Sequence, residues 1–152
     1  MSKDERPSHG ELLARARAGL LAVEHEEQAT TALRVQAARA LKDVHDSGAY
    51  QDEGHATFAA WLGATLGRKE RMGRVYLAAA NVEPELVVGR NLDWSRLAVL
   101  GPQPPWLQAL MAEHAEALSV AALRKVAAAA MQFPKHGPTR AKEELARQLA
   151  GG

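Results

Sequence analysis

The sequence has 152 residues, a formal net charge of +1 and no cysteine. This length suits one compact domain, or one small domain with a helical arm. The lack of cysteine excludes disulfides, thiolate zinc sites and cysteine nucleophiles, and it fits a reducing compartment. Ala, Leu, Arg and Glu dominate, whereas β-branched and aromatic residues are sparse, so the composition predicts an all-α, multi-helix fold.

The sequence also lacks the patterns of membrane proteins and of common enzymes. No apolar run approaches the ~20 residues that a membrane span needs, and the first residues are polar and charged. We therefore expect a cytoplasmic protein with no membrane partner. Gly-Lys-Ser, Gly-Lys-Thr, His-Glu-x-x-His and Gly-x-Ser-x-Gly do not occur. We therefore expect no enzyme activity, no catalytic residue and no cofactor.

The first part of the sequence predicts a disordered N-terminal segment, here called the lead, followed by a long helix. Residues 1–10 have no periodic apolar pattern, which indicates a disordered lead. Over residues 11–48, apolar side chains recur every three or four positions, which predicts one long helix, or a helix pair with a break near Thr30. Gly48 is expected to end it. An arm of this length favours a homodimer, although packing against its own chain is the plainer alternative.

The rest of the chain predicts a helical domain over residues 49–132 and a basic C-terminal helix within residues 133–152. Capping residues, glycines and prolines set the expected boundaries. Residues 49–56 are expected to form a linker. The expected helices are 58–66, 68–80, 94–100, 105 to about 118, 120–132 and a last helix to about 149, with a short helix or turn near 85–89. The expected N-caps are Thr57, Asp93, Ser119 and Thr139 for the helices that follow them.

Residues 58–80 match a helix-turn-helix. This motif needs a short helix, a tight turn that admits positive φ, and a second helix with one buried and one open face. Leu62, Gly63 and Leu66 are expected to form the buried side of the first helix, and Gly67 lies at the turn. Gly73, Tyr76, Leu77 and Ala80 follow as the expected inward stripe of the second helix.

Basic residues occupy the outward face of that second helix. Arg is the usual reader of guanine in the major groove, so Arg71 and Arg74 are predicted to contact bases. Arg68 and Lys69 lie at the helix start, where backbone N–H groups and the helix dipole favour phosphate, so we expect backbone contacts from them. The alternative is a solvated charged face, which is common on amphipathic helices.

Three segments resemble a small family of phage- and plasmid-type helix-turn-helix proteins. They read ALKDVHDSGAY (40–50), GHATFAAWL (54–62) and LGRKERMGRVYLAAANV (66–82), and residues 92–100 and 119–124 also resemble the helical continuation of ParB-like partition proteins. The resemblance implies a DNA-binding transcriptional regulator or partition-type accessory protein. The chain departs from the family at Ala59 and Ala60, where an acidic residue is usual, and at Arg68 and Lys69, where a Ser or Thr cap is usual.

Positive charge is concentrated in two blocks. Residues 68–90 hold five basic and three acidic residues, and residues 124–152 hold six basic and two acidic ones. In the second block Arg124, Lys125 and Arg140 are predicted to contact DNA phosphates, with a solvated helical tail as the alternative.

Two other groups of residues invite a functional interpretation. A polar cluster, His45, Asp46, Asp52, Glu53 and His55, has the side chains of a metal or acid-base site but no recognised spacing, so we expect no metal. Trp94 and Trp106, with the Ala-rich helices, support an alternative function as a protein-protein interaction adaptor that does not bind DNA.

Overall fold

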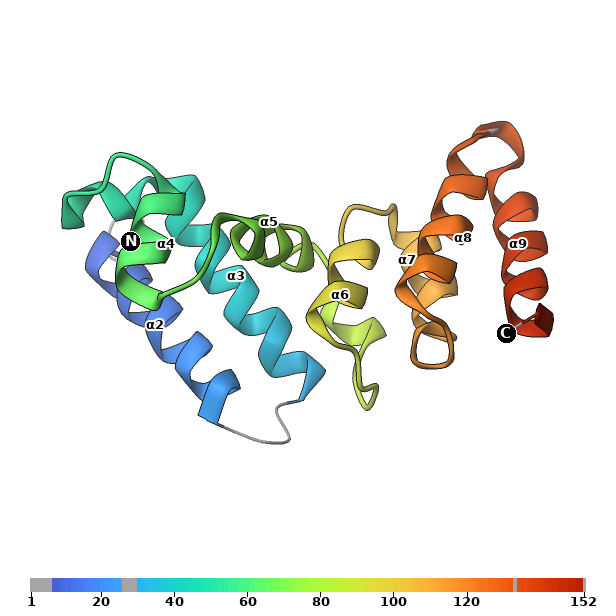
Figure 1. Ribbon diagram of the computed structural model, residues 1–152, viewed down its shortest axis with the longest axis horizontal. Coiled ribbons are helices and arrows are strands. Elements are labelled where there is room, and N and C mark those ends of the chain that lie inside the picture. Colours follow the sequence, from blue (N-terminus) through green and yellow to red (C-terminus); the bar gives the residue numbers. More distant parts are fainter. Residues whose placement is uncertain (1–6, 26–29, 133, 152) are drawn as a thin grey trace, which may run out of the picture.

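The computed structural model describes residues 7–25, 30–132 and 134–151, and over these residues the chain is all-α, as predicted. Its elongated row of helices runs from α2–α4 at one end to α9 at the other, with α5 in the middle (Figure 1). Short 3₁₀ segments lie between the helices. The α-helices are α2 (His9–His25), α3 (Thr31–Ser47), α4 (Phe58–Leu66), α5 (Glu70–Ala79), α6 (Trp94–Leu100), α7 (Pro105–Ala112), α8 (Val120–Gln132) and α9 (Gly137–Gly151). The 3₁₀ segments are η1 (Ala49–Glu53), η2 (Pro84–Leu86), η3 (Ala115–Ala117) and η4 (Pro134–His136).

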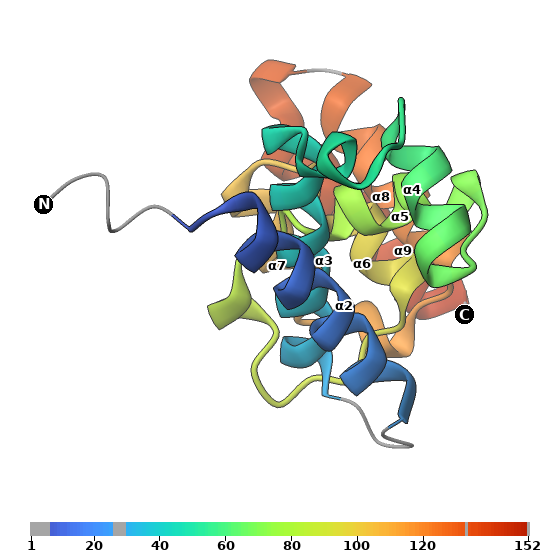
Figure 2. The same ribbon diagram turned by 90° about the vertical axis from the view of Figure 1, so that its left-hand side faces the viewer.

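The N-terminal part is a helix pair, the second form that the sequence predicted. Thr30 caps α3 by accepting a hydrogen bond from the backbone N–H of Leu33 at 3.2 Å, and Gly48 ends α3 with φ of 75°. Helices α2 and α3 lie side by side (Figures 1 and 2). The disordered lead was predicted to reach residue 10, but α2 begins at His9; residues 1–6 lie outside the described part of the chain.

Several predicted helix boundaries are confirmed by their caps. Thr57 accepts from the N–H of Ala60 at 3.1 Å, and Asp93 accepts from that of Arg96 at 3.0 Å. Ser119 accepts from the N–H of Ala122 at 3.0 Å. Such caps satisfy N–H groups that have no partner inside the helix.

Three other predicted boundaries are wrong. The helix from Pro105 ends at Ala112, and the chain continues through η3. The Arg96 guanidinium donates hydrogen bonds to the carbonyls of Ala115, in η3, and Leu118, directly after it, at 2.8–3.0 Å. The last helix begins at Gly137, so Thr139 lies inside it and does not cap it. The predicted linker 49–56 contains η1.

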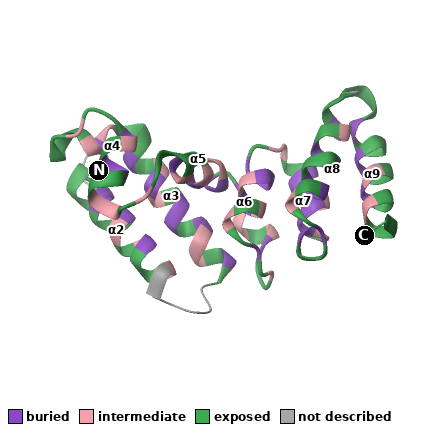
Figure 3. Ribbon diagram, viewed as in Figure 1, coloured by how far each residue is buried: buried purple, intermediate pink, exposed green. Residues whose placement is uncertain are grey.

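Two hydrophobic clusters hold the helices together. The N-terminal cluster joins α2, α3, η1, α4 and Tyr76 of α5 around the fully buried Trp61. The C-terminal cluster joins α3, the end of α5 and α6–α9. Trp94 packs against both clusters. Figure 3 shows the buried residues on the inner sides of the helices and exposed residues along the outer side of α9.

The apolar side of α2 is covered by the chain itself. Leu12, Leu13, Ala16 and Leu20 are buried in the N-terminal cluster. The apolar side of α2 therefore needs no second copy of the chain to bury it. This agrees with the alternative to a homodimer given above, in which the N-terminal helix packs against its own chain. None of the helices in the described ranges is both long and apolar enough to cross a membrane.

Gly101 allows α6 to lie against the end of α5. A β-carbon at Gly101 would lie 1.7 Å from the carbonyl oxygen of Ala78. The backbone dihedral angles of Gly101 are those of a right-handed helix, which any residue can adopt, so the close approach alone requires glycine here. We expect Gly101→Ala to lower the free energy of unfolding by about 2–3 kcal/mol, because the two backbones must move apart. Urea denaturation measures this change.

Gly63→Ala is the matched control for this substitution. A β-carbon there would lie 3.6 Å from the Arg68 carbonyl oxygen, an ordinary contact, and alanine suits a helix better than glycine does. Equal stability of the Gly101→Ala variant and the wild type would show that α5 and α6 do not pack this closely.

Candidate nucleic-acid interface

A three-residue turn joins α4 to α5. Gly67 adopts φ of 65°, a left-handed conformation that glycine accepts without strain, and its N–H bonds back to the Gly63 carbonyl at 3.1 Å. The N–H of Arg68 donates to the Leu62 carbonyl at 3.3 Å, so Arg68 still belongs to the end of α4. Helix α5 therefore begins at Glu70, two residues after the predicted start.

The two helices of this unit approach each other at Gly73. A β-carbon on Gly73 would lie 3.1 Å from Cδ2 of Leu62 and 3.6 Å from Cε2 of Phe58. Gly63 was predicted on the buried side of α4, but it is exposed, so that prediction is wrong. The predicted inward stripe is otherwise confirmed, with Gly73, Tyr76 and Ala80 buried and Leu77 half-buried.

The basic residues at the start of α5 point into solvent. Lys69, Arg71 and Arg74 are exposed. The closest approach of Arg74 to Glu70 is 3.7 Å, and their side chains are 74% and 71% exposed. An ion pair of this kind contributes little to stability, so it holds Arg74 only weakly. Lys69 occupies the N-cap position without a side-chain capping bond, which leaves N–H groups of the first turn open to solvent.

Arg68 differs from these three residues. It is half-buried, and its Nε atom is inaccessible to solvent. Burial raises the pKa of Tyr76, and Arg68 opposes that shift. The structure therefore turns Arg68 toward the interior, away from the exposed positions of the other predicted DNA contacts.

The C-terminal basic residues lie on other elements. Arg124 and Lys125 are exposed on α8, and Arg140 is exposed on α9 with Glu143 at 3.5 Å. Helices α8 and α9 are separated from α5 by α6 and α7 (Figure 1). The predicted site residues therefore form two groups, one at the start of α5 and one at the far end of the molecule.

His45 is a neighbour of α5 that the sequence analysis did not connect with it. A pocket of about 170 Å³ is lined by Glu70, Gly73, Arg74 and Leu77 of α5, by Phe58 and Ala59 of α4, and by His45 of α3. The ring of His45 packs edge-on against Phe58, with centroids 5.3 Å apart. Because His45 is far from α5 in the sequence, no local pattern indicates this proximity.

Asp46 and Asp52 of the predicted polar cluster form structural contacts. His9 contacts Asp52 at 2.7 Å, and Asp46 bonds to Lys42 and His45, which lower the pKa of Asp46. Within the described ranges, no group of three or more His, Asp or Glu side chains is arranged to hold a metal ion.

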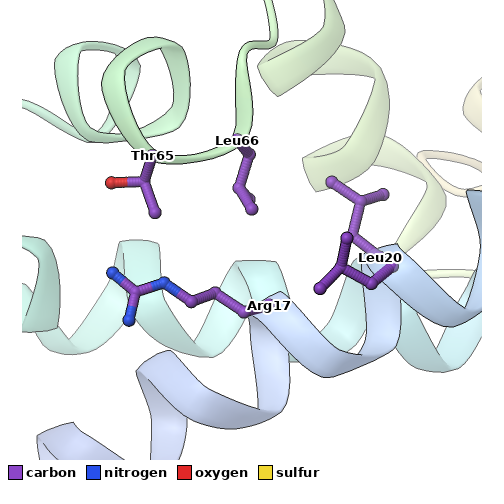
Figure 4. Close-up of a pocket in the computed structure, with 5 residues that line it drawn as sticks. Arg17, Leu20, Thr65 and Leu66 are labelled. Carbon is purple, nitrogen blue, oxygen red and sulfur yellow. The ribbon is translucent and has the colours of Figure 1, made fainter.

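Glu53 ties η1 to two helices. Its carboxylate accepts a hydrogen bond from Nε1 of the buried Trp61 at 2.7 Å and pairs with the Arg17 guanidinium at 2.6 and 2.7 Å. The Trp61 hydrogen bond and then Arg17 hold the pKa of Glu53 below its ordinary value of 4.5, against the opposing effect of desolvation. Arg17 also lines a pocket of about 190 Å³ with Leu20, Leu21, Thr65 and Leu66, between α2 and the end of α4 (Figure 4).

We expect Glu53→Gln to lower the free energy of unfolding at pH 7 and to have a smaller effect at pH 3. A lowered pKa in the folded state stabilises the fold above the unfolded-state pKa, and this contribution is lost as pH falls through the folded-state value. Urea denaturation at both pH values measures the difference. Glu11→Gln is the control, because Glu11 is exposed and 3.9 Å from Arg15. A pH-independent loss of stability would contradict the role of the Glu53 charge.

Comparison of the chain with protein families, with curated proteins and with solved structures gives no match.

Proposed function

We propose that this protein binds double-stranded DNA through the α4–turn–α5 unit, with α5 in the major groove. The observation that supports this proposal is the exposure of Lys69, Arg71 and Arg74 around the first turns of α5, directly after a tight glycine turn. The first residues of a recognition helix are those that reach base edges in proteins of this type.

The chemistry of each residue fits a separate role. Arg71 and Arg74 carry planar guanidinium groups, which donate two hydrogen bonds to O6 and N7 of guanine. Lys69 lies beside the open N–H groups of the α5 start, where both the side chain and the helix dipole favour a phosphate. Resemblance to phage- and plasmid-type helix-turn-helix proteins supports a transcriptional regulator or a partition-type accessory protein, acting on DNA in the cytoplasm or nucleoid.

A homodimer is part of this proposal on grounds of DNA geometry. Helix-turn-helix proteins usually read two half-sites about 34 Å apart with two copies of the unit. Since α2 is packed on its own chain, a dimer would use another surface. Sedimentation of the protein with and without DNA distinguishes a dimer from a monomer.

The first test of DNA binding is fluorescence anisotropy with a labelled duplex while salt is raised from about 50 to about 200 mM. We expect affinity to fall steeply with salt, because binding releases counterions from the phosphates. Arg71→Ala and Arg74→Ala are each expected to weaken binding by about 1–3 kcal/mol. Arg15→Ala is a matched control, since Arg15 is 62% exposed on α2 and lies 3.9 Å from Glu11, much as Arg74 lies near Glu70. No binding at low salt, or equal losses for Arg15 and Arg74, would contradict the proposal.

The same assay tests the C-terminal basic residues. If Arg124, Lys125 and Arg140 contact phosphates, replacing all three by alanine lowers the salt slope by about 2.7, at roughly 0.9 for each phosphate contact. The affinity should fall equally for all duplex sequences, because phosphate contacts carry no sequence information. An unchanged slope would show that this block is a solvated surface.

A protein-binding adaptor is the second candidate function. Trp106 and Met131 favour it, because these large apolar side chains are 42% and 62% exposed. Apolar surface of this kind is common at interfaces between proteins. An adaptor predicts negligible duplex binding at low salt and no effect of the α5 substitutions.

A further inference from the structure

We propose that α5 selects a thymine next to the guanine that Arg74 reads, because an apolar hollow beside Arg74 receives the 5-methyl group of that thymine. The hollow is the pocket of about 170 Å³ described above, which is lined by α5, the start of α4 and His45 near the end of α3. This inference rests on the proposed function and adds to it the base sequence that the α4–turn–α5 unit reads.

The hollow lies at the edge of the exposed face of α5. The α5 residues that line it are Glu70, Gly73, Arg74 and Leu77, and their spacing of i, i+3, i+4 and i+7 places them along one stripe of the helix. The side chains of Glu70 and Arg74 are 71% and 74% exposed. Gly73 is buried and Leu77 is half-buried. The same stripe therefore joins the solvent-exposed Arg74 to the side of α5 that packs on its neighbours.

Phe58 supplies an apolar wall that is held in place. Its ring meets the rings of His45, Tyr50 and Trp61, with centroids 5.3, 6.2 and 5.7 Å away. Trp61 is fully buried in the N-terminal cluster. A ring with neighbours of this kind has little freedom to move, so the hollow has a fixed shape before any ligand enters.

Two small residues keep the hollow open. Gly73 contributes no side chain, and a β-carbon there would lie 3.6 Å from Cε2 of Phe58. Ala59 lines the hollow with a single methyl group and is half-buried. Proteins read the 5-methyl group of thymine in the major groove through apolar contacts of this kind. The lining therefore suits a methyl group at the edge of a base.

The charges around the hollow favour a base edge over a phosphate. The Glu70 carboxylate lines the hollow, and a second carboxylate, that of Asp46, lies 2.9 Å from Nδ1 of His45. Both carboxylates repel a phosphate, whereas a methyl group carries no charge.

Arg74 specifies the base next to that methyl group. Its guanidinium group can donate two hydrogen bonds to O6 and N7 of guanine. Successive bases of one strand are about 3.4 Å apart along the helix axis, so a thymine beside this guanine brings its methyl group close to the residues that adjoin Arg74. The arrangement therefore predicts a preference for thymine beside guanine.

Replacing one thymine by uracil tests the inference, because it removes the methyl group and keeps the other atoms of the base. Selection by the wild-type protein from a random duplex pool supplies the sequence, in which we expect a thymine next to a guanine at a fixed position. Uracil there should weaken binding about fourfold, the effect of leaving one methyl group unburied. 5-Methylcytosine there should bind about fourfold more tightly than cytosine. Fluorescence anisotropy measures these affinities.

Ala59→Leu tests whether the hollow is the place of contact. The leucine side chain fills the hollow, so this variant should bind the thymine and uracil duplexes equally. Ala60→Leu is the matched control, because Ala60 is the exposed neighbour of Ala59 and is not part of the lining. It should keep the fourfold preference. Circular dichroism shows whether both variants are folded, and the comparison of thymine with uracil in the wild type needs no variant.

Several results would overturn the inference. They are equal affinities of the wild type for the thymine and uracil duplexes, a selected sequence without thymine beside guanine, and a fourfold preference that survives in folded Ala59→Leu or is lost in Ala60→Leu as well. If the wild type binds no duplex at low salt, the proposed function fails and this inference fails with it. Duplex binding that ignores the methyl group overturns this inference alone.

Discussion

Helix α5 contributes buried side chains to both hydrophobic clusters, Tyr76 to the N-terminal one and Ala79 to the C-terminal one. Glycines allow the close approach on both sides, since Gly73 lies against α4 and Gly101 of α6 lies against the Ala78 carbonyl. A close-packed helix of this kind has no room to rotate or slide. The face of α5 that remains in solvent is therefore set by the packing of the two clusters around it.

The arrangement of charge follows from this constraint. In the N-terminal half, several polar and charged side chains pair with each other within the fold: Arg17 pairs with Glu53, and His9 contacts Asp52. On α5, Arg74 has only a loose, exposed contact with Glu70. A basic side chain that is held in place by its helix but only weakly paired with an acidic residue can leave water and bind a phosphate or a base edge at a small cost in free energy. This is the physical basis for proposing DNA as the partner.

The sequence predicts the local features of this structure well and the long-range ones poorly. Thr57, Gly67 and Asp93 act within a few residues of themselves, so their caps and turns can be inferred from spacing. The partial burial of Arg68 depends on the packing of the turn in three dimensions, whereas a charged residue at a predicted helix start suggests exposure. The chain after Ala112 likewise receives hydrogen bonds from Arg96 of α6, a contact that no periodicity indicates.

The central claim is that the start of α5 is the surface that meets DNA, and amide chemical shifts on titration with a duplex test it most directly. We expect the largest shifts over residues 67–74, from the glycine turn through Arg74, with smaller shifts in α8 and α9. Shifts confined to the surface around Trp106 and α8–α9, or no shifts at low salt, would contradict it.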